Sequence, residues 1–277
     1  MKKIKKNMLW TFMLVFMLIP KLYAETITIV PAGQPGGNQF TRANLYKDVL
    51  TKMGHTVVFE NIPNTLEGSK YLENNVGKDK TVIMMYTGNA PSQTGYNITG
   101  KNFVLTELEE PQYWCQSNVS KDKQKLNVGL VKNMNNEFSD ELFKKLGKET
   151  VYLRYKNSGD LYNAITSGDI DVMFTNQSQS LKLIENNQGT CIANTSKDDH
   201  IGIPSIYKVI DTKKVFPGNV LIVISNNPSN KLRNLLIEAN KDPLFTEWRA
   251  KRKYSEISNR SRKKELSFAL TTQELWK

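Results

Sequence analysis

The sequence predicts an α/β protein with two lobes. Strand-like and helix-like segments alternate along the chain, which is typical of mainly parallel sheets covered by helices. The pattern is clearest where a strand at 26–30 leads through a glycine loop at 31–37 into an amphipathic helix. It starts afresh with a strand at 126–131, so two sets of strands and helices are expected.

The helix after the first glycine loop carries one apolar stripe. Phe40, Tyr46 and Met53 belong to it, and Gly54 follows where a helix commonly ends on glycine. A glycine loop before a helix directs unpaired backbone N–H groups and the positive end of the helix dipole at its surroundings. Gly36 and Gly37 are therefore candidate anion-binding residues, although glycines can also serve only to permit a tight turn.

The second set of elements repeats this layout. Strands are expected at 126–131, 151–155 and 170–174, with the last clear strand at 220–225. Ligands of open α/β sheets bind outside the carboxyl ends of the strands. The loops that follow strands should therefore converge on one cleft; they are 31–38, 86–91, 132–136, 156–159 and 174–178. The chain is expected to cross between the lobes near 115–122 and 215–224, which gives lobe 1 as 25–118 plus 222–277 and lobe 2 as 119–221.

Residues 1–24 have the order of a secretory signal peptide. Four lysines lie among the first six residues, an apolar run extends from Met8 to Ile19, and Ala24 ends a cleavage site. The apolar run is too short to span a bilayer, although a retained anchor is the alternative. The mature chain is expected to begin at Glu25 in the periplasm, and removal of the five lysines of the peptide lowers the net charge from +11 to +6.

The chain has two cysteines, Cys115 and Cys191, and both lie in the mature part. An oxidising compartment favours pairing them, and the alternative is two buried thiols. A bridge that closes such a long loop stabilises by about 4 kcal/mol in the loop-entropy model.

Several functional classes find no support in the sequence. The two histidines, His55 and His200, have no metal-binding spacing, and no nucleophile elbow or dinucleotide fingerprint is present. No catalytic residue, metal or cofactor is therefore expected. Lysines and arginines cluster near 251–264, but export removes nucleic acid as a partner, and a solvated helical face accounts for them.

The N-terminal unit resembles a known family. The run Ile27-Thr-Ile-Val-Pro-Ala-Gly-Gln-Pro-Gly-Gly37, then Arg42, then Gly54-His-Thr-Val-Val-Phe-Glu-Asn61 is similar to the start of mature tripartite tricarboxylate transporter substrate-binding proteins, the Bug family. Looser matches follow in order: Tyr155-Lys-Asn-Ser-Gly159, Gly168-Asp-Ile-Asp171 and Ile203-Pro-Ser205.

The resemblance implies a type II periplasmic-binding-protein fold that closes on a small carboxylate. It implies ligand contacts from the first loop, where Asn38 stands at the place of the family's aspartate, and from the second-lobe loops. An asparagine is neutral and can donate to a carboxylate. The candidate ligand-binding residues are Gly36, Gly37, Asn38, Tyr86, Lys132, Asn133, Tyr155, Ser158 and Asp171.

The expected function is capture of a small organic carboxylate and its delivery to the membrane subunits of a tripartite transporter, by a monomeric protein that is not an enzyme. Two alternatives remain open: a ligand sensor that acts with a sensor kinase, and an exported hydrolase. The sequence does not choose among dicarboxylates, tricarboxylates, aromatic acids and amino acids. It also leaves open whether a surface role explains Lys132 better than a ligand contact.

Overall fold

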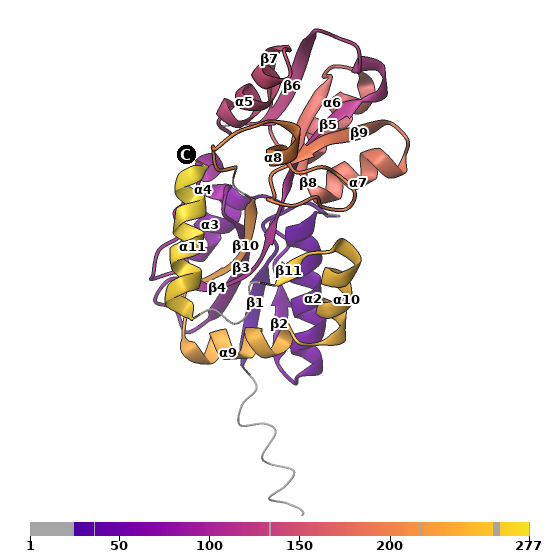
Figure 1. Ribbon diagram of the computed structural model, residues 1–277. Coiled ribbons are helices and arrows are strands. Elements are labelled where there is room, and N and C mark those ends of the chain that lie inside the picture. Colours follow the sequence, from indigo (N-terminus) through magenta and orange to yellow (C-terminus); the bar gives the residue numbers. More distant parts are fainter. Residues whose placement is uncertain (1–24, 36, 133, 217, 257–260, 277) are drawn as a thin grey trace, which may run out of the picture.

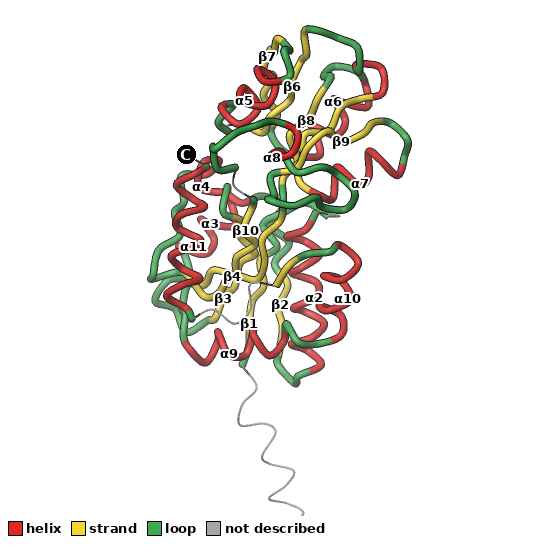
Figure 2. The backbone as a smooth tube through the Cα atoms, in the orientation of Figure 1, coloured by secondary structure: helices red, strands yellow, loops and turns green. Residues whose placement is uncertain are grey.

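The protein is described here by a computed structural model. It describes residues 25–35, 37–132, 134–216, 218–256 and 261–276. The expected signal peptide lies outside these ranges, as do Gly36 and Asn133. The described chain forms two lobes, one above the other in Figure 1, and each lobe is a sheet flanked by helices (Figure 2).

Lobe 1 contains a six-stranded sheet in the order β11-β4-β10-β3-β1-β2. β1 runs parallel to β2 and β3, whereas β10 runs antiparallel to both β3 and β4. The inner strands β1, β3 and β10 are rich in apolar residues that are buried on both faces, as expected for a sheet covered on both sides. They are β1 (Thr26–Val30), β2 (Thr56–Phe59), β3 (Thr81–Thr87), β4 (Phe103–Glu110), β10 (Asn219–Ser225) and β11 (Ser255–Glu256).

Helices cover both faces of this sheet. α2, α9 and α10 pack on the face that carries Ile27 and Ile29, and α3, α4 and α11 pack on the face that carries Val30. α2 ends as expected, with Gly54 at a positive φ of 91° just after the helix. The helices are α2 (Asn38–Lys52), α3 (Thr65–Glu73), α4 (Ala90–Thr94), α9 (Asn230–Ala239), α10 (Pro243–Arg252) and α11 (Arg262–Leu275).

Lobe 2 contains a five-stranded sheet in the order β7-β6-β8-β5-β9. β6 is parallel to β7 and β8, and β5 is antiparallel to β8 and β9. The strands are β5 (Gln112–Ser117), β6 (Lys125–Val131), β7 (Glu149–Tyr155), β8 (Val172–Asn176) and β9 (Gly189–Asn194). The helices are α5 (Glu137–Lys145), α6 (Ser158–Ser167), α7 (Gln177–Glu185) and α8 (Ile206–Val209), with a 3-10 turn, η2, at Asn118–Ser120.

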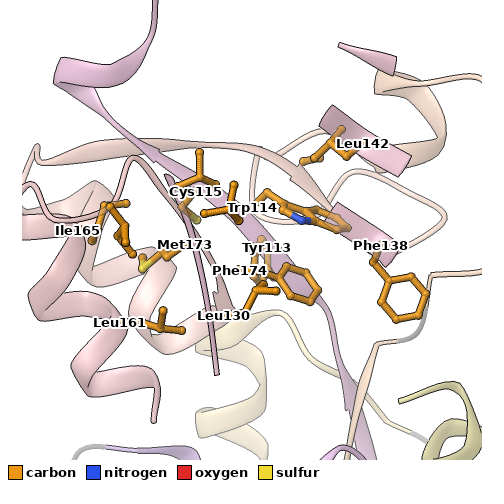
Figure 3. Packing of buried hydrophobic residues seen from close by; sticks show 14 of the residues in the cluster. Tyr113, Trp114, Cys115, Leu130, Phe138, Leu142, Leu161, Ile165, Met173 and Phe174 are labelled. Atoms are coloured by element: carbon orange, nitrogen blue, oxygen red, sulfur yellow. The ribbon is translucent and has the colours of Figure 1, made fainter. Parts of the chain in front are cut away.

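The core of lobe 2 is aromatic. The Trp114 and Phe174 rings stack with centroids 4.5 Å apart, and Phe138 of α5 lies beyond them (Figure 3). Trp276, the residue after α11, joins this cluster with its ring 5.8 Å from that of Phe138. A lobe 1 helix therefore ends on a side chain that is buried in lobe 2.

The chain crosses between the sheets twice. β4 ends at Glu110 in the first sheet and β5 begins at Gln112 in the second, so the first crossing is at Pro111. This point precedes the expected region 115–122, and β5 belongs to lobe 2 because it pairs with β8 and β9. On the return, Phe216 packs in the lobe 2 core and β10 begins at Asn219, so the expected cut between 221 and 222 falls inside β10.

The two sheets face each other along their carboxyl edges. β4 shares its direction with β3 and β1, because β10 is antiparallel to both β3 and β4. Glu110 therefore lies at the carboxyl edge of the first sheet. In the second sheet Gln112 pairs with Asn176, the last residue of β8. Pro111 thus joins the two edges at which ligands of open α/β sheets bind.

Cys115 and Cys191 form a disulfide, with their Cα atoms 3.8 Å apart on the neighbouring strands β5 and β9. The expected pairing is confirmed. A search of the described ranges for a helix both long and apolar enough to cross a membrane finds none.

Candidate functional site

The N-terminus of α2 has no side-chain cap. Gly37 is its N-cap residue, and no side chain caps the helix and no acidic residue lies in the first turn. The first backbone N–H groups of a helix have no partner within the helix, and the dipole favours negative charge there. β1 and the following loop place this end of α2 at the carboxyl edge of the first sheet.

The helix starts of lobe 2 differ from that of α2, because side chains of the same helix or its N-cap residue cap them or place negative charge in the first turn. Asn157 caps α6 by accepting from Asp160 N at 2.9 Å, and Asn176 caps α7 by accepting from Gln179 N at 3.2 Å. α5 carries Glu137 and Asp140 in its first turn. α2 differs from these helices in having neither a side-chain cap nor an acidic residue in its own first turn.

Asn38, the first residue of α2, makes its hydrogen bonds within the protein. Its Nδ2 donates to Glu110 Oε1 at 2.7 Å and to the Tyr254 hydroxyl at 2.9 Å. An amide nitrogen has two hydrogens, so both are used. Donation from Asn38 to a ligand carboxylate, as expected from the sequence, does not fit this arrangement.

Glu110 joins the two lobes. Its Oε1 accepts from Asn38 and Tyr254 of lobe 1 and from the backbone N–H of Gln177, the first residue of α7, at 3.1 Å. The residue is only 1% exposed, and burial raises the pKa of Glu110 from 4.5 to about 7, while these hydrogen bonds and the charge of Arg252 act in the opposite direction. Burial also raises the pKa of Tyr254, so its hydroxyl stays a donor.

Two further contacts connect the lobes beside this carboxylate. Gln177 Nε2 donates to the backbone oxygen of Arg252 at 2.7 Å, and His200 Nε2 lies 2.9 Å from that of Lys253. The other ring nitrogen of His200 lies 2.6 Å from the Tyr113 hydroxyl. The end of α10 is therefore docked on lobe 2 through its backbone.

Buried acceptors remain at the same place. Asn38 Oδ1 and Gln177 Oε1 are buried and have no hydrogen-bond partner among the described residues. The residues are 6% and 0% exposed. Leaving such a group without a partner costs about 1–3 kcal/mol, so these two oxygens are the unsatisfied polar atoms beside Glu110.

The other candidates of lobe 1 lie in different surroundings. Gly37 is half-buried, and its N–H donates to Gln34 O at 3.0 Å. Tyr86 is fully buried, donates its hydroxyl to the backbone oxygen of Tyr96, and accepts from Arg42 at its own backbone oxygen. Tyr86 is therefore part of the lobe 1 core, and its ring faces no ligand here.

The lobe 2 candidates stand on loops at the carboxyl edge. Lys132 is exposed, and its backbone N–H donates to Tyr155 O at 2.7 Å, which joins the loops after β6 and β7. Tyr155 is half-buried against the lobe 2 core, and Ser158 is the first residue of α6.

Asp171 lies at the opposite edge. It precedes β8, and its carboxylate accepts from Lys123 Nζ at 2.8 Å and from Asn127 N at 2.9 Å. It is 4% exposed and fastens the start of β8 to the 120s loop. Its role is thus structural. The Gly-x-x-Asp resemblance had suggested a ligand contact, and a sequence motif alone does not reveal at which end of a strand a residue lies.

Three residues of the site were missed by sequence reasoning: Glu110, Gln177 and Tyr254. They are separated by 67 and more positions, as the Glu110–Gln177 and Glu110–Tyr254 pairs show. One signal was available. Gln177 lies within 174–178, one of the loops that the sequence predicts to converge on the cleft. Nothing in the local sequence singles out Glu110.

Comparison with known proteins gives a fold and no close sequence relative. No family model and no curated protein matches this chain. Among solved structures, Rpa4515 of R. palustris with adipate has a TM-score of 0.73 at 16% identity, covering 92% of this chain and 95% of that one. MatC from Rhodopseudomonas palustris with bound malate has a TM-score of 0.69 at 11% identity, covering 92% and 98%. The periplasmic binding protein BugD has a TM-score of 0.69 at 13% identity, covering 92% and 95%. These matches confirm the two-lobed type II fold and the expected resemblance at the level of fold.

Proposed function

We propose that this chain is an exported solute-binding protein of the tripartite tricarboxylate type, which holds a small organic carboxylate between its lobes. The observation that carries the proposal is the uncapped start of α2 at the carboxyl edge that faces lobe 2. Backbone N–H groups at a helix start bind carboxylates well. Among solved structures of the same fold, Rpa4515 is a structure with adipate and MatC one with bound malate.

In this proposal the ligand carboxylate sits on the first turn of α2. Gly36 and Gly37 precede that turn in the sequence, and the proposed contacts from lobe 2 are Lys132, Tyr155 and Ser158, with Asn133 kept as a candidate from its sequence position alone. Lys132 adds positive charge, and Ser158 supplies a hydroxyl at the start of α6. Asp171 and Tyr86 are not part of this site, because the first lies at the far edge and the second is buried in lobe 1.

A carboxylate library tested by thermal shift on the chain from Glu25 onward checks the proposal. A ligand at 100 times its dissociation constant raises the free energy of unfolding by about 2.7 kcal/mol. Stabilisation by carboxylates and not by sugars or plain amines is the expected result. A library in which no carboxylate shifts the melting temperature would contradict the proposed function.

A charge placed in the first turn of α2 tests the position of the ligand. Gln39→Glu should stabilise the free protein slightly, by about 0.3–1 kcal/mol through the helix dipole. It should weaken carboxylate binding at least tenfold, because the new side-chain carboxylate interacts with the same positive helix end as the ligand and repels it. Asn230→Asp is the matched control, since Asn230 is exposed at the start of α9, after the strand β10 that ends at the opposite sheet edge. Calorimetry that finds equal losses for both variants would place the ligand elsewhere.

The proposed partners are the membrane subunits of a tripartite transporter. The basis is the fold shared with periplasmic binding proteins together with the lysine-rich start and apolar run of residues 1–24. Deletion of the gene should abolish uptake of the acid that thermal shift identifies, and uptake that persists unchanged would favour the sensing alternative.

A further inference from the structure

The end of α10 is fastened to lobe 2 by two hydrogen bonds of its backbone. The carbonyl oxygen of Arg252 accepts from Gln177 Nε2 at 2.7 Å, and that of Lys253 lies 2.9 Å from His200 Nε2. A backbone oxygen only accepts, so His200 donates here. We call residues 252–254 the clasp, because they join a helix of lobe 1 to two segments of lobe 2.

Glu110 bonds to the clasp and to both lobes. Its Oε1 accepts from the Tyr254 hydroxyl at 3.0 Å, from Asn38 of α2 at 2.7 Å and from the backbone N–H of Gln177 in α7 at 3.1 Å. All three donors meet at one oxygen of a buried side chain. A single carboxyl group therefore holds the clasp, α2 and α7 together.

This carboxyl group is buried without a cationic partner in direct contact. None of the ion pairs that the described residues form includes Glu110. An ionised carboxylate loses far more hydration on burial than a neutral carboxyl group does. Because Gln177 contacts Glu110 from lobe 2, moving lobe 2 away from the clasp admits water to the carboxyl group. Docking is therefore more favourable when Glu110 is neutral.

The other titratable groups around Glu110 keep one charge state near neutral pH. Burial lowers the pKa of Arg42 in α2 to about 10, so this group remains a cation, as does Arg252 in the clasp. Burial raises the pKa of Tyr113 in β5 and of Tyr254, so both phenols stay neutral. Asn219, the β10 partner of Glu110, has no charge to change.

We infer that the clasp is a pH-sensitive connection between the lobes: protonation of Glu110 holds lobe 2 on residues 252–254, and ionisation of Glu110 releases it. The device acts on the lobes themselves and does not depend on the identity of a ligand. His200 contacts both Tyr113 and Lys253 and is the neighbouring group whose titration the test must separate from that of Glu110.

The direction of the response follows from the two pKa values. The docked form binds one proton more than the released form between pH 4.5, the ordinary value, and about 7, the buried one. The ratio of released to docked molecules therefore rises with pH across this interval, at most tenfold per pH unit, and levels off above it.

Hydrogen exchange of the Gln177 backbone N–H, followed by NMR on the unmodified chain from Glu25 onward, tests the inference. Its protection factor, corrected for the intrinsic rate at each pH, should fall at least tenfold between pH 5 and pH 8. It should stay below the protection factors of Met85 in β3 and Val128 in β6, which lie in the two cores. Equal protection of Gln177 at both pH values would overturn the inference, and so would exchange no faster than that of the core groups.

Three variants assign the response to a residue. Glu110→Gln cannot ionise and keeps an accepting oxygen, so its Gln177 protection should be the same at pH 8 as at pH 5. Glu73→Gln, at the exposed end of α3, is the matched control and should keep the wild-type fall. His200→Gln removes the histidine titration but keeps a donor for Lys253, and it should also keep the fall. A fall that persists in Glu110→Gln, or that disappears in His200→Gln, would overturn the role of Glu110.

Discussion

Glu110 shows how one side chain can connect two lobes. Its carboxylate accepts donors from α2, from the β11 region and from α7, three elements that are far apart in the sequence. Burial favours the neutral form, and the donors favour the charged form. The balance leaves the pKa of Glu110 at about 7, so the charge at this junction changes within the ordinary range of pH.

Replacing this carboxyl group should change how stability depends on pH. The folded-state pKa of about 7 lies above the ordinary 4.5, so the contribution of Glu110 is full below pH 4.5 and is lost as pH rises through 7. At about 1.4 kcal/mol per pKa unit, the loss is on the order of 3 kcal/mol. Glu110→Gln should remove this decrease of the free energy of unfolding with pH, as measured by urea unfolding between pH 4.5 and 8. Glu73→Gln, at the exposed end of α3, should keep the slope; equal slopes in all three proteins would refute the assignment.

Among the elements, β1 and α2 were predictable and β5 was not. The apolar stripe of α2 and the glycine after it are local signals, and the structure has them where expected. β5 carries Tyr113, Trp114 and Cys115, which are all buried, so no alternation of polar and apolar residues marks it as a strand. Its position between β8 and β9 in the second sheet follows from pairing with those two strands, which local sequence does not encode.

The same reasoning explains the limits of the site prediction. The glycine loop and the helix start are contiguous in sequence, and their placement at a sheet edge could be predicted. Which groups Asn38 contacts could not, because Glu110 and Tyr254 are 72 and 216 positions away. Asp171 was misplaced because it lies at the start of β8, away from the carboxyl edge at which the site is proposed.

The disulfide should stabilise the pair β5 and β9. It closes a loop of 76 positions, for which the loop-entropy model gives about 4 kcal/mol. The double variant Cys115→Ala, Cys191→Ala should lower the free energy of unfolding by an amount of that order in denaturant titrations. Wild-type protein kept reduced with a thiol is the matched reference, and a variant as stable as the oxidised protein would show that the bridge contributes little.

At the scale of the molecule, the lobes are joined by more than their two crossings. α11 packs on lobe 1, yet Trp276 at its end is 1% exposed within the core of lobe 2 and donates from Nε1 to Gly218 O at 3.3 Å. Any opening of the lobes must carry this ring along or release it.

Trp276→Ala should therefore have two effects. Loss of a buried tryptophan costs about 3–5 kcal/mol, and the free protein should also become more extended in small-angle scattering. Phe143→Ala is the control, because Phe143 is equally buried in the lobe 2 core and is itself part of the lobe 2 helix α5. An unchanged radius of gyration in Trp276→Ala would show that the ring does not restrain the lobes.

The position of β10 has a consequence for the order of folding. β10 lies between β3 and β4, yet it is made only after all of lobe 2. A chain that emerges from its N-terminus can complete the sheet of lobe 2 from contiguous residues, while the sheet of lobe 1 remains in two parts until residues 219–225 arrive. Pulse-labelled hydrogen exchange during refolding should protect β6 and β8 before β3 and β4, and simultaneous protection would show that the lobes fold as one unit. During synthesis, lobe 2 could therefore be complete while lobe 1 still lacked its central strand β10.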